Sequence, residues 1–182
     1  MEWLNWIIGI VAAVVAIAVI GVCAMRSRFT SLSYACEDAY AVVDRFFKKR
    51  YDLIPAFIDV IQEHAAHETG VIENLIAYRN ASIKAASLME KCELESQLAD
   101  TFRELLAMAD KYQALRVSAV FMTLKHDLRA VELDIANAGE QYNRRAKQYN
   151  AYYDQAISNI VATLFQRKKM AEFVIRQTGI EE

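Results

Sequence analysis

The most pronounced hydrophobic pattern lies near the N-terminus, where residues 7–25 contain no charged side chain. A helix of this length is about 28 Å long at ~1.5 Å per residue, which matches the ~30 Å hydrocarbon core of a bilayer. Trp3 and Trp6 precede the stretch, and Arg26 and Arg28 follow it. Indole rings and basic side chains favour membrane–water interfaces. The pattern therefore predicts a transmembrane helix that contacts the lipid bilayer along its length.

This stretch is expected to remain in the mature protein as an anchor. A cleaved signal peptide begins with a basic region, whereas residues 1–6 carry Glu2 as their only charged side chain. Cytoplasmic flanks are enriched in Lys and Arg, and here the basic residues follow the span, so the N-terminus is predicted outside and the rest of the chain in the cytoplasm. The sequence thus divides into an anchor over residues 1–28 and a second domain over residues 29–182.

A second hydrophobic pattern predicts a long helix in the C-terminal half. Its apolar positions alternate between steps of four and three residues: Val117, Phe121, Leu124, Leu128, Val131, Ile135, Ala138 and Tyr142. A heptad seam of this length is typical of a helix packed lengthwise against other helices. Arg145 takes the next step of the seam, and apolar packing resumes at Tyr149 and Tyr153.

Two interruptions predict element boundaries before this helix. Pro55, with Asp52 three residues earlier, suits either the first turn of a new helix or a kink in a continuing one. Between residues 87 and 95 the apolar rhythm lapses, which predicts a loop followed by a shorter helix. We therefore expect an all-α protein, in which one N-terminal transmembrane helix is followed by an antiparallel bundle of three or four long helices.

Composition supports the helical class and excludes several functions. The 182 residues include five Gly and one Pro, too few for the turns of a sandwich, a barrel or a doubly wound sheet. A net charge of −2 implies no basic face for nucleic acid. Three Cys without a CxxC pair do not suggest a disulfide scaffold or a thiolate metal site. Motifs for nucleophilic catalysis or phosphate binding are lacking, so neither an enzyme nor a cofactor is predicted.

One cluster carries metal-ligand chemistry. His67 and Glu68 lie three and four residues after His64, so two or three of these side chains could converge if the segment is helical. Their order, H-x-x-H-E, matches neither the H-E-x-x-H of zinc peptidases nor the Glu-x-x-His of di-iron bundles. A metal site is therefore the less favoured interpretation of these residues.

A buried polar layer is the favoured interpretation. Glu68 and Arg79 are eleven residues apart and fall on one helical face, where a carboxylate and a guanidinium need polar partners such as Tyr142 or Asn143. Asn143 and Asn150 are seven residues apart and share a face of the predicted long helix. Asn at such positions can fix helix register or oligomeric state.

A basic run precedes Pro55 and consists of Arg45, Lys48, Lys49 and Arg50. We interpret it as a solvated charged turn. The alternative is contact with anionic lipid headgroups, which attract Lys and Arg that lie near the leaflet.

The same region carries a resemblance to a known family. Residues 48–55 read Lys-Lys-Arg-Tyr-Asp-Leu-Ile-Pro and resemble a signature of the LemA family of bacterial membrane-anchored helical proteins. His-Glu at 67–68, and Tyr-Asn at 142–143 and 149–150, look like further family motifs. Gly139 stands where Arg is common, and the expected Phe-Pro and Gly-Phe pairs are absent near the C-terminus, so the chain resembles a divergent member. The resemblance implies an all-helical, membrane-anchored domain and brings no agreed biochemical activity.

These features together predict a non-enzymatic scaffold. A bacterial inner-membrane helix would present a cytoplasmic bundle that self-assembles, docks partner proteins or organises the membrane. Small residues four apart in the span, such as Gly9 and Ala13, would allow two copies to pack as a homo-oligomer. The alternative is a metal-binding or metal-dependent membrane protein that uses His64, His67 and Glu68.

Overall fold

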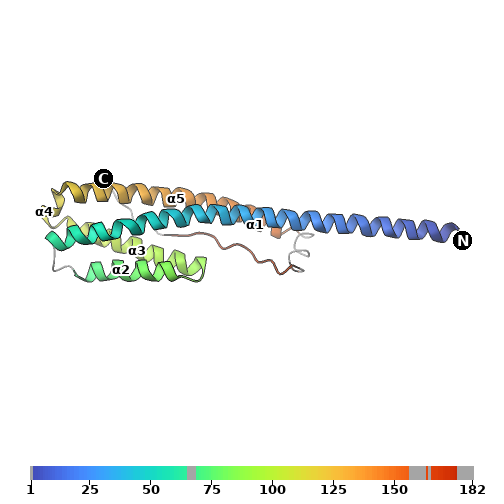
Figure 1. Ribbon diagram of the computed structural model, residues 1–182, viewed down its shortest axis with the longest axis horizontal. Coiled ribbons are helices and arrows are strands. Elements are labelled where there is room, and N and C mark those ends of the chain that lie inside the picture. Colours follow the sequence, from blue (N-terminus) through green and yellow to red (C-terminus); the bar gives the residue numbers. More distant parts are fainter. Residues whose placement is uncertain (1, 65–68, 156–162, 164, 176–182) are drawn as a thin grey trace. The chain divides into compact units, whose positions relative to one another are not determined.

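The computed structural model describes residues 2–64, 69–155, 163 and 165–175, and within these ranges every regular element is a helix. The helices are α1 (Glu2–His64), α2 (Thr69–Lys84), α3 (Leu88–Ala109), α4 (Gln113–Arg116) and α5 (Ala119–Tyr153) (Figure 1). The all-α prediction, with one long apolar N-terminal helix, is confirmed.

The chain packs as two compact units, and each contains part of α1 and part of α5. The first unit comprises Met1–Asp38 and Arg144–Met170, and the second comprises Ala39–Asn143 and Ala171–Glu182. The predicted boundary between residues 28 and 29 separates a membrane anchor from a second domain. The division into compact units does not test it, so it stays a prediction.

The core of the second unit is built where three helices contribute aromatic side chains. Phe57 of α1 lies edge-on to Phe102 of α3 and to Phe121 of α5, with ring centroids 5.6 and 5.9 Å apart. All three side chains are buried, and burying such large rings is among the strongest favourable contributions to folding. Helices far apart in sequence are thereby held in one bundle.

The heptad seam predicted for the last long helix is confirmed over most of its length. From Phe121 to Tyr142 each predicted seam residue of α5 is buried. The prediction is wrong at both ends of the seam. Val117 precedes the helix and is 75% exposed. Arg145 is exposed, and its neighbour Ala146 is buried instead.

The loop predicted for residues 87–95 is also wrong, since α3 begins at Leu88. Ser87 is its N-cap, with Oγ accepting a hydrogen bond from the Glu90 backbone N–H at 3.2 Å, while the Glu90 carboxylate accepts from the Ala86 N–H at 2.9 Å. Both side chains accept from backbone N–H groups at the start of the helix, and such bonds stabilise its first turn. The apolar rhythm lapses because several buried positions of this helix are polar, among them Lys91 and Glu95.

The structure decides between the two alternatives for Pro55, which lies inside α1 and is exposed. Proline has no backbone N–H, so one helical hydrogen bond is lost at this position. Helix α1 nevertheless continues to His64. Around Pro55 its inner face is made of buried apolar side chains, including Ile54, Phe57 and Ile61, whose packing maintains the helix.

The first unit has an aromatic cluster of its own. Phe29 of α1 is buried and lies edge-on to Tyr149, Tyr152 and Tyr153 of α5, with centroid distances of 4.7–6.5 Å. Preceding Phe29, α1 contains an 18-residue window that is apolar enough to cross a membrane, and none of this window is buried. It is the one such helix among the described residues.

Candidate functional site

The most unusual feature of the second unit is a set of charged and polar side chains buried at the centre of the bundle. We call it the Arg50 cluster: Arg50, Tyr51, Ser82, Lys91, Glu95 and Glu132. Arg50 of α1 has no exposed surface, and Glu95 of α3 is equally buried. Charged side chains are almost never fully buried unless they are paired, so the arrangement of their partners decides what this cluster can do.

Arg50 joins three helices through its two terminal nitrogens. Nη1 donates to the Glu132 carboxylate of α5 at 2.7 Å, and Nη2 donates to the Glu95 carboxylate of α3. Nη2 is also 3.3 Å from the backbone oxygen of Glu95. Planar guanidinium groups suit such forked contacts with carboxylates. Arg50 therefore fixes α1, α3 and α5 at one level of the bundle.

The second carboxylate oxygen of Glu95 accepts hydrogen bonds from the hydroxyls of Tyr51 and Ser82. Lys91 lies beside this group, and its Nζ donates to the backbone oxygen of Ser82 at 2.8 Å. The Nζ atom is also 3.8 Å from the Glu95 carboxylate and 4.0 Å from that of Asp44. Glu95 is thus surrounded by donors from α1, α2 and α3.

The cluster is electrostatically balanced, with two cations (Arg50 and Lys91) and two buried carboxylates (Glu95 and Glu132). Burial acts to lower the pKa of Arg50, but the Glu132 and Glu95 carboxylates outweigh it, and its pKa is raised above the ordinary value. Burial, and then the Glu95 carboxylate, raise the pKa of Tyr51 far above its ordinary value. Arg50 is therefore held charged and Tyr51 neutral, a static arrangement that favours a structural role.

Arg50 corrects the interpretation of the basic run as a solvated turn. The run lies inside α1, so it is helical and does not form a turn. Arg45, Lys48 and Lys49 are exposed, but Arg50 is buried. The sequence contained the signal. Arg50 continues a seam with steps of four and three whose other members are all buried and apolar: Val43, Phe47, Ile54, Phe57 and Ile61. A charged residue in phase with such a seam indicates a buried ion pair.

Alkaline pH is expected to destabilise the fold through buried groups such as Tyr51 of the Arg50 cluster and Cys92 of α3. Burial raises the pKa of Tyr51, and burial likewise raises the pKa of the Cys92 thiol. The folded state binds both protons more tightly than the unfolded chain does. The free energy of unfolding is thus highest below the unfolded pKa values of about 8.5 for Cys and about 10 for Tyr, and it falls as the pH rises through and above them.

Urea unfolding of the full chain in detergent, followed by circular dichroism between about pH 7 and about pH 11, measures this effect. Tyr51→Phe is expected to reduce the decline at the alkaline end, whereas Tyr34→Phe, at an exposed tyrosine, is the matched control. An unfolding midpoint that stays constant over this range would contradict the prediction.

The metal-ligand cluster receives no support from the described residues. His64 is half-buried at the end of α1, while His67 and Glu68 lie outside the described residues. In the part of the chain that the structure describes, no group of three His, Cys, Asp or Glu side chains is placed to hold a metal ion. The remaining histidine, His126, has an exposed side chain.

The other residues predicted for a polar layer occupy different places. Arg79 is half-buried, and its Nε is buried without a hydrogen-bond partner among the described residues. Tyr142, Asn143 and Asn150 each bond to the backbone of the C-terminal segment. The Tyr142 hydroxyl donates to the Ala171 oxygen at 3.0 Å. Partners of this kind, in a segment without regular structure, were not expected from the sequence.

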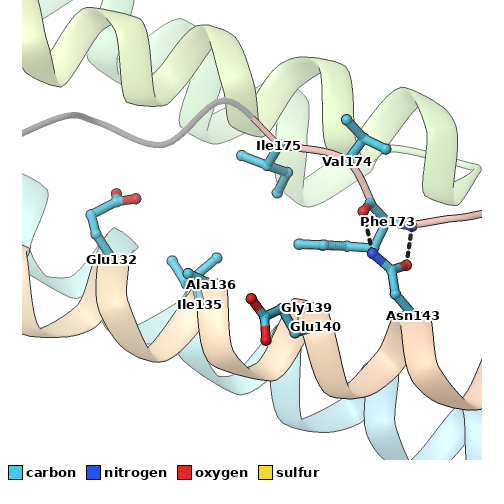
Figure 2. A pocket seen from close by; sticks show the side chains of 9 residues that line it. All are labelled: Glu132, Ile135, Ala136, Gly139, Glu140, Asn143, Phe173, Val174 and Ile175. Carbon is cyan, nitrogen blue, oxygen red and sulfur yellow. Dashed lines mark hydrogen bonds between the residues drawn. The ribbon is translucent and has the colours of Figure 1, made fainter.

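Asn143 forms the more complete contact. Its Oδ1 accepts from the Phe173 backbone N–H at 2.7 Å, and its Nδ2 donates to the Phe173 backbone oxygen at 2.8 Å (Figure 2). In the first unit Asn150 makes the same pair of bonds with Met170, both at 2.9 Å. A hollow of about 210 Å³ beside Phe173 is lined by α5 and by residues 173–175.

The predicted membrane-flanking residues lie along α1. Trp3 and Trp6 are strongly exposed. The Arg26 guanidinium lies 5.0 Å from the ring centroid of Phe165, and that of Arg28 lies 5.3 Å from the ring centroid of Tyr152. Both arginines therefore make cation–π contacts within the first unit, and both remain exposed.

The protein is a helical-bundle protein with one candidate membrane span among its described residues. This class follows from the all-helical fold, from the buried ionic cluster that joins three helices and from the exposed apolar N-terminal helix. The sequence profile of the LemA family matches residues 39–182, and the chain belongs to this family. No curated protein matches the chain significantly.

Proposed function

We propose that this protein is a membrane-anchored, non-enzymatic helical scaffold of the bacterial inner membrane, crossing it once with the N-terminus outside and the bundle in the cytoplasm. The observation that carries the proposal is the apolar window of α1, which the described part of the chain leaves uncovered. A row of exposed Ile and Val side chains along residues 7–22 is unfavourable in water and favourable in a bilayer.

The non-enzymatic part of the proposal is supported by the Arg50 cluster. Catalytic acids and bases need a free proton position facing a substrate. Here the carboxylates of Glu95 and Glu132 are engaged by Arg50, and Glu95 is further engaged by Tyr51 and Ser82. The cluster thus stabilises the bundle, and the surface of the bundle is left to bind proteins, either other partners or further copies of the chain.

Membrane fractionation tests the anchor. We expect the full chain to stay in the membrane pellet after alkaline extraction, and the double variant Val14→Lys/Ile17→Asp to become extractable. Each central charge costs about 2.5–3.5 kcal/mol on insertion. Leu133→Asp, a charge on an exposed position of α5, is the matched control and should stay in the pellet.

Sidedness needs a separate readout. In inside-out vesicles, protease is expected to remove a C-terminal epitope tag, whereas in intact spheroplasts the same tag should be protected. The opposite pattern would place the bundle outside the cytoplasm. Release of the wild-type chain by alkaline extraction would overturn the anchor itself.

A further inference from the structure

The C-terminal segment is held as a peptide ligand would be held. We call residues 171–175 the strap. These residues have no regular structure, and the strap is bound chiefly through its backbone. Asn143 of α5 contacts both the N–H and the oxygen of Phe173, and Tyr142 contacts the oxygen of Ala171. Side-chain amides that bond a backbone in this way replace the neighbouring strand that an extended peptide would otherwise need.

One side chain anchors the strap. Phe173 is 7% exposed, and its ring centroid lies 6.1 Å from that of Phe47 and 6.4 Å from that of Tyr142. On α5 the ring faces Gly139, where an added Cβ would overlap the ring atoms. The glycine therefore forms the floor of the aromatic site, and a side chain at this position forces the Phe173 ring to move (Figure 2).

We propose that this site also receives the strap of a second copy of the chain, so that exchanged straps link copies into an assembly. The receptor residues (Phe47, Gly139, Tyr142 and Asn143) and Phe173 meet through noncovalent contacts alone, and every copy carries both halves. Exchanging an identical element between copies is a low-cost route to association because it reuses contacts that already form.

The covalent connection permits the exchange. Helix α5 ends at Tyr153, and Phe165 follows twelve residues later along the sequence, a separation that a chain can bridge over at most about 40 Å at ~3.3 Å per residue. Packed helices lie only about 8–10 Å apart. The inference rests on the proposed anchor, since copies confined to one bilayer meet at high effective concentration.

A crosslink that forms only between copies tests the proposal. In the first unit Lys169 Nζ lies 2.8 Å from an Asp154 carboxylate oxygen, and a carbodiimide joins such a pair directly. Full-length Lys169→Arg and Asp154→Asn chains, with different tags, are co-expressed and treated in native membranes. Neither variant alone can form this bond. A Lys169–Asp154 crosslink in the mixture therefore requires the Asp154→Asn copy to donate its segment to the Lys169→Arg copy.

The expected result is a covalent dimer of the two tagged chains, with this crosslink identified by mass spectrometry. Adding Gly139→Leu to the Lys169→Arg copy, whose receptor is used, should reduce the dimer at least tenfold. The same substitution in the Asp154→Asn copy, whose receptor is not used, is the matched control and should leave the dimer unchanged. Phe173→Ala removes the ring of the donated strap. It should reduce the dimer when placed in the Asp154→Asn copy and leave the dimer unchanged when placed in the Lys169→Arg copy.

Other outcomes overturn the exchange and remain distinguishable from failure of the scaffold. If the two tagged chains copurify without the crosslink, the copies assemble through another surface. If they do not copurify, the strap stays within its own chain, and both the exchange and self-assembly are rejected. The proposal of a membrane anchor is not affected by this result. Two further results also reject a second copy as the occupant of the Phe173 site. One is a dimer that forms equally well with Gly139→Leu in either copy, and the other is a crosslink from Lys169 to a different protein.

Discussion

Replacing Arg50 with methionine is expected to lower the free energy of unfolding by about 3–5 kcal/mol. The substitution retains much of the volume of the side chain but leaves Glu95 and Glu132 buried without their shared cation. A carboxylate that has lost its partner keeps the cost of its removal from water. The loss therefore reflects the cation removed from between two buried carboxylates more than a change in packing.

Urea unfolding of the full chain in detergent micelles, followed by circular dichroism, measures this loss. The control is Arg45→Met, which removes the same charge from an exposed position on the same helix and should change stability by no more than about 0.5 kcal/mol. The triple variant Arg50→Met/Glu95→Leu/Glu132→Leu is expected to recover much of the loss, because an apolar set of similar volume avoids the buried charges. Equal effects of Arg50→Met and Arg45→Met would show that the cluster contributes little.

Truncating Leu128 to alanine is expected to cost about 2–5 kcal/mol. Leu128 lies on the heptad seam of α5 and has no exposed surface, so the substitution removes buried methyl groups and leaves a cavity that the surrounding helices only partly fill. The same substitution at Leu133, five residues later and 62% exposed, should change stability by no more than about 0.5 kcal/mol.

The two leucine variants form a matched pair, since the side chain, the helix and the deletion are the same. Thermal and urea unfolding of both variants measures the contrast. Similar losses at the two positions would mean that Leu133 is covered in the assembled protein, for instance by another copy. A negligible loss at Leu128 would contradict the seam as the packing face of α5.

The ionic cluster gives this bundle a property that apolar packing alone would not supply. Heptad seams allow helices to slide by whole repeats at modest cost. The two terminal nitrogens of Arg50 are paired with carboxylates only when Glu95 and Glu132 lie at its own level. We therefore expect the cluster to fix the register of α1, α3 and α5, a specificity role that buried polar groups serve in some helical assemblies.

Features that depend on local pattern could be predicted from the sequence. The uncharged stretch at residues 7–25 and the seam from Phe121 to Tyr142 are signals of period and composition, and both appear in the structure as an exposed apolar helix and a buried face. Family membership was equally accessible, because the motif at residues 48–55 is contiguous. Such signals need no knowledge of which elements meet.

The partners of the buried polar residues became known only from the packing of the helices. Glu95 and Glu132 lie 45 and 82 residues from Arg50, and the bonds of Asn143 lead to a segment 30 residues away. The phase of Arg50 with an apolar seam indicates that it is buried, but the polar residues that pair with it look the same in sequence as polar residues that stay in solvent. The difference is made by donors and acceptors from other helices, since only they can offset the cost of removing the charge from water.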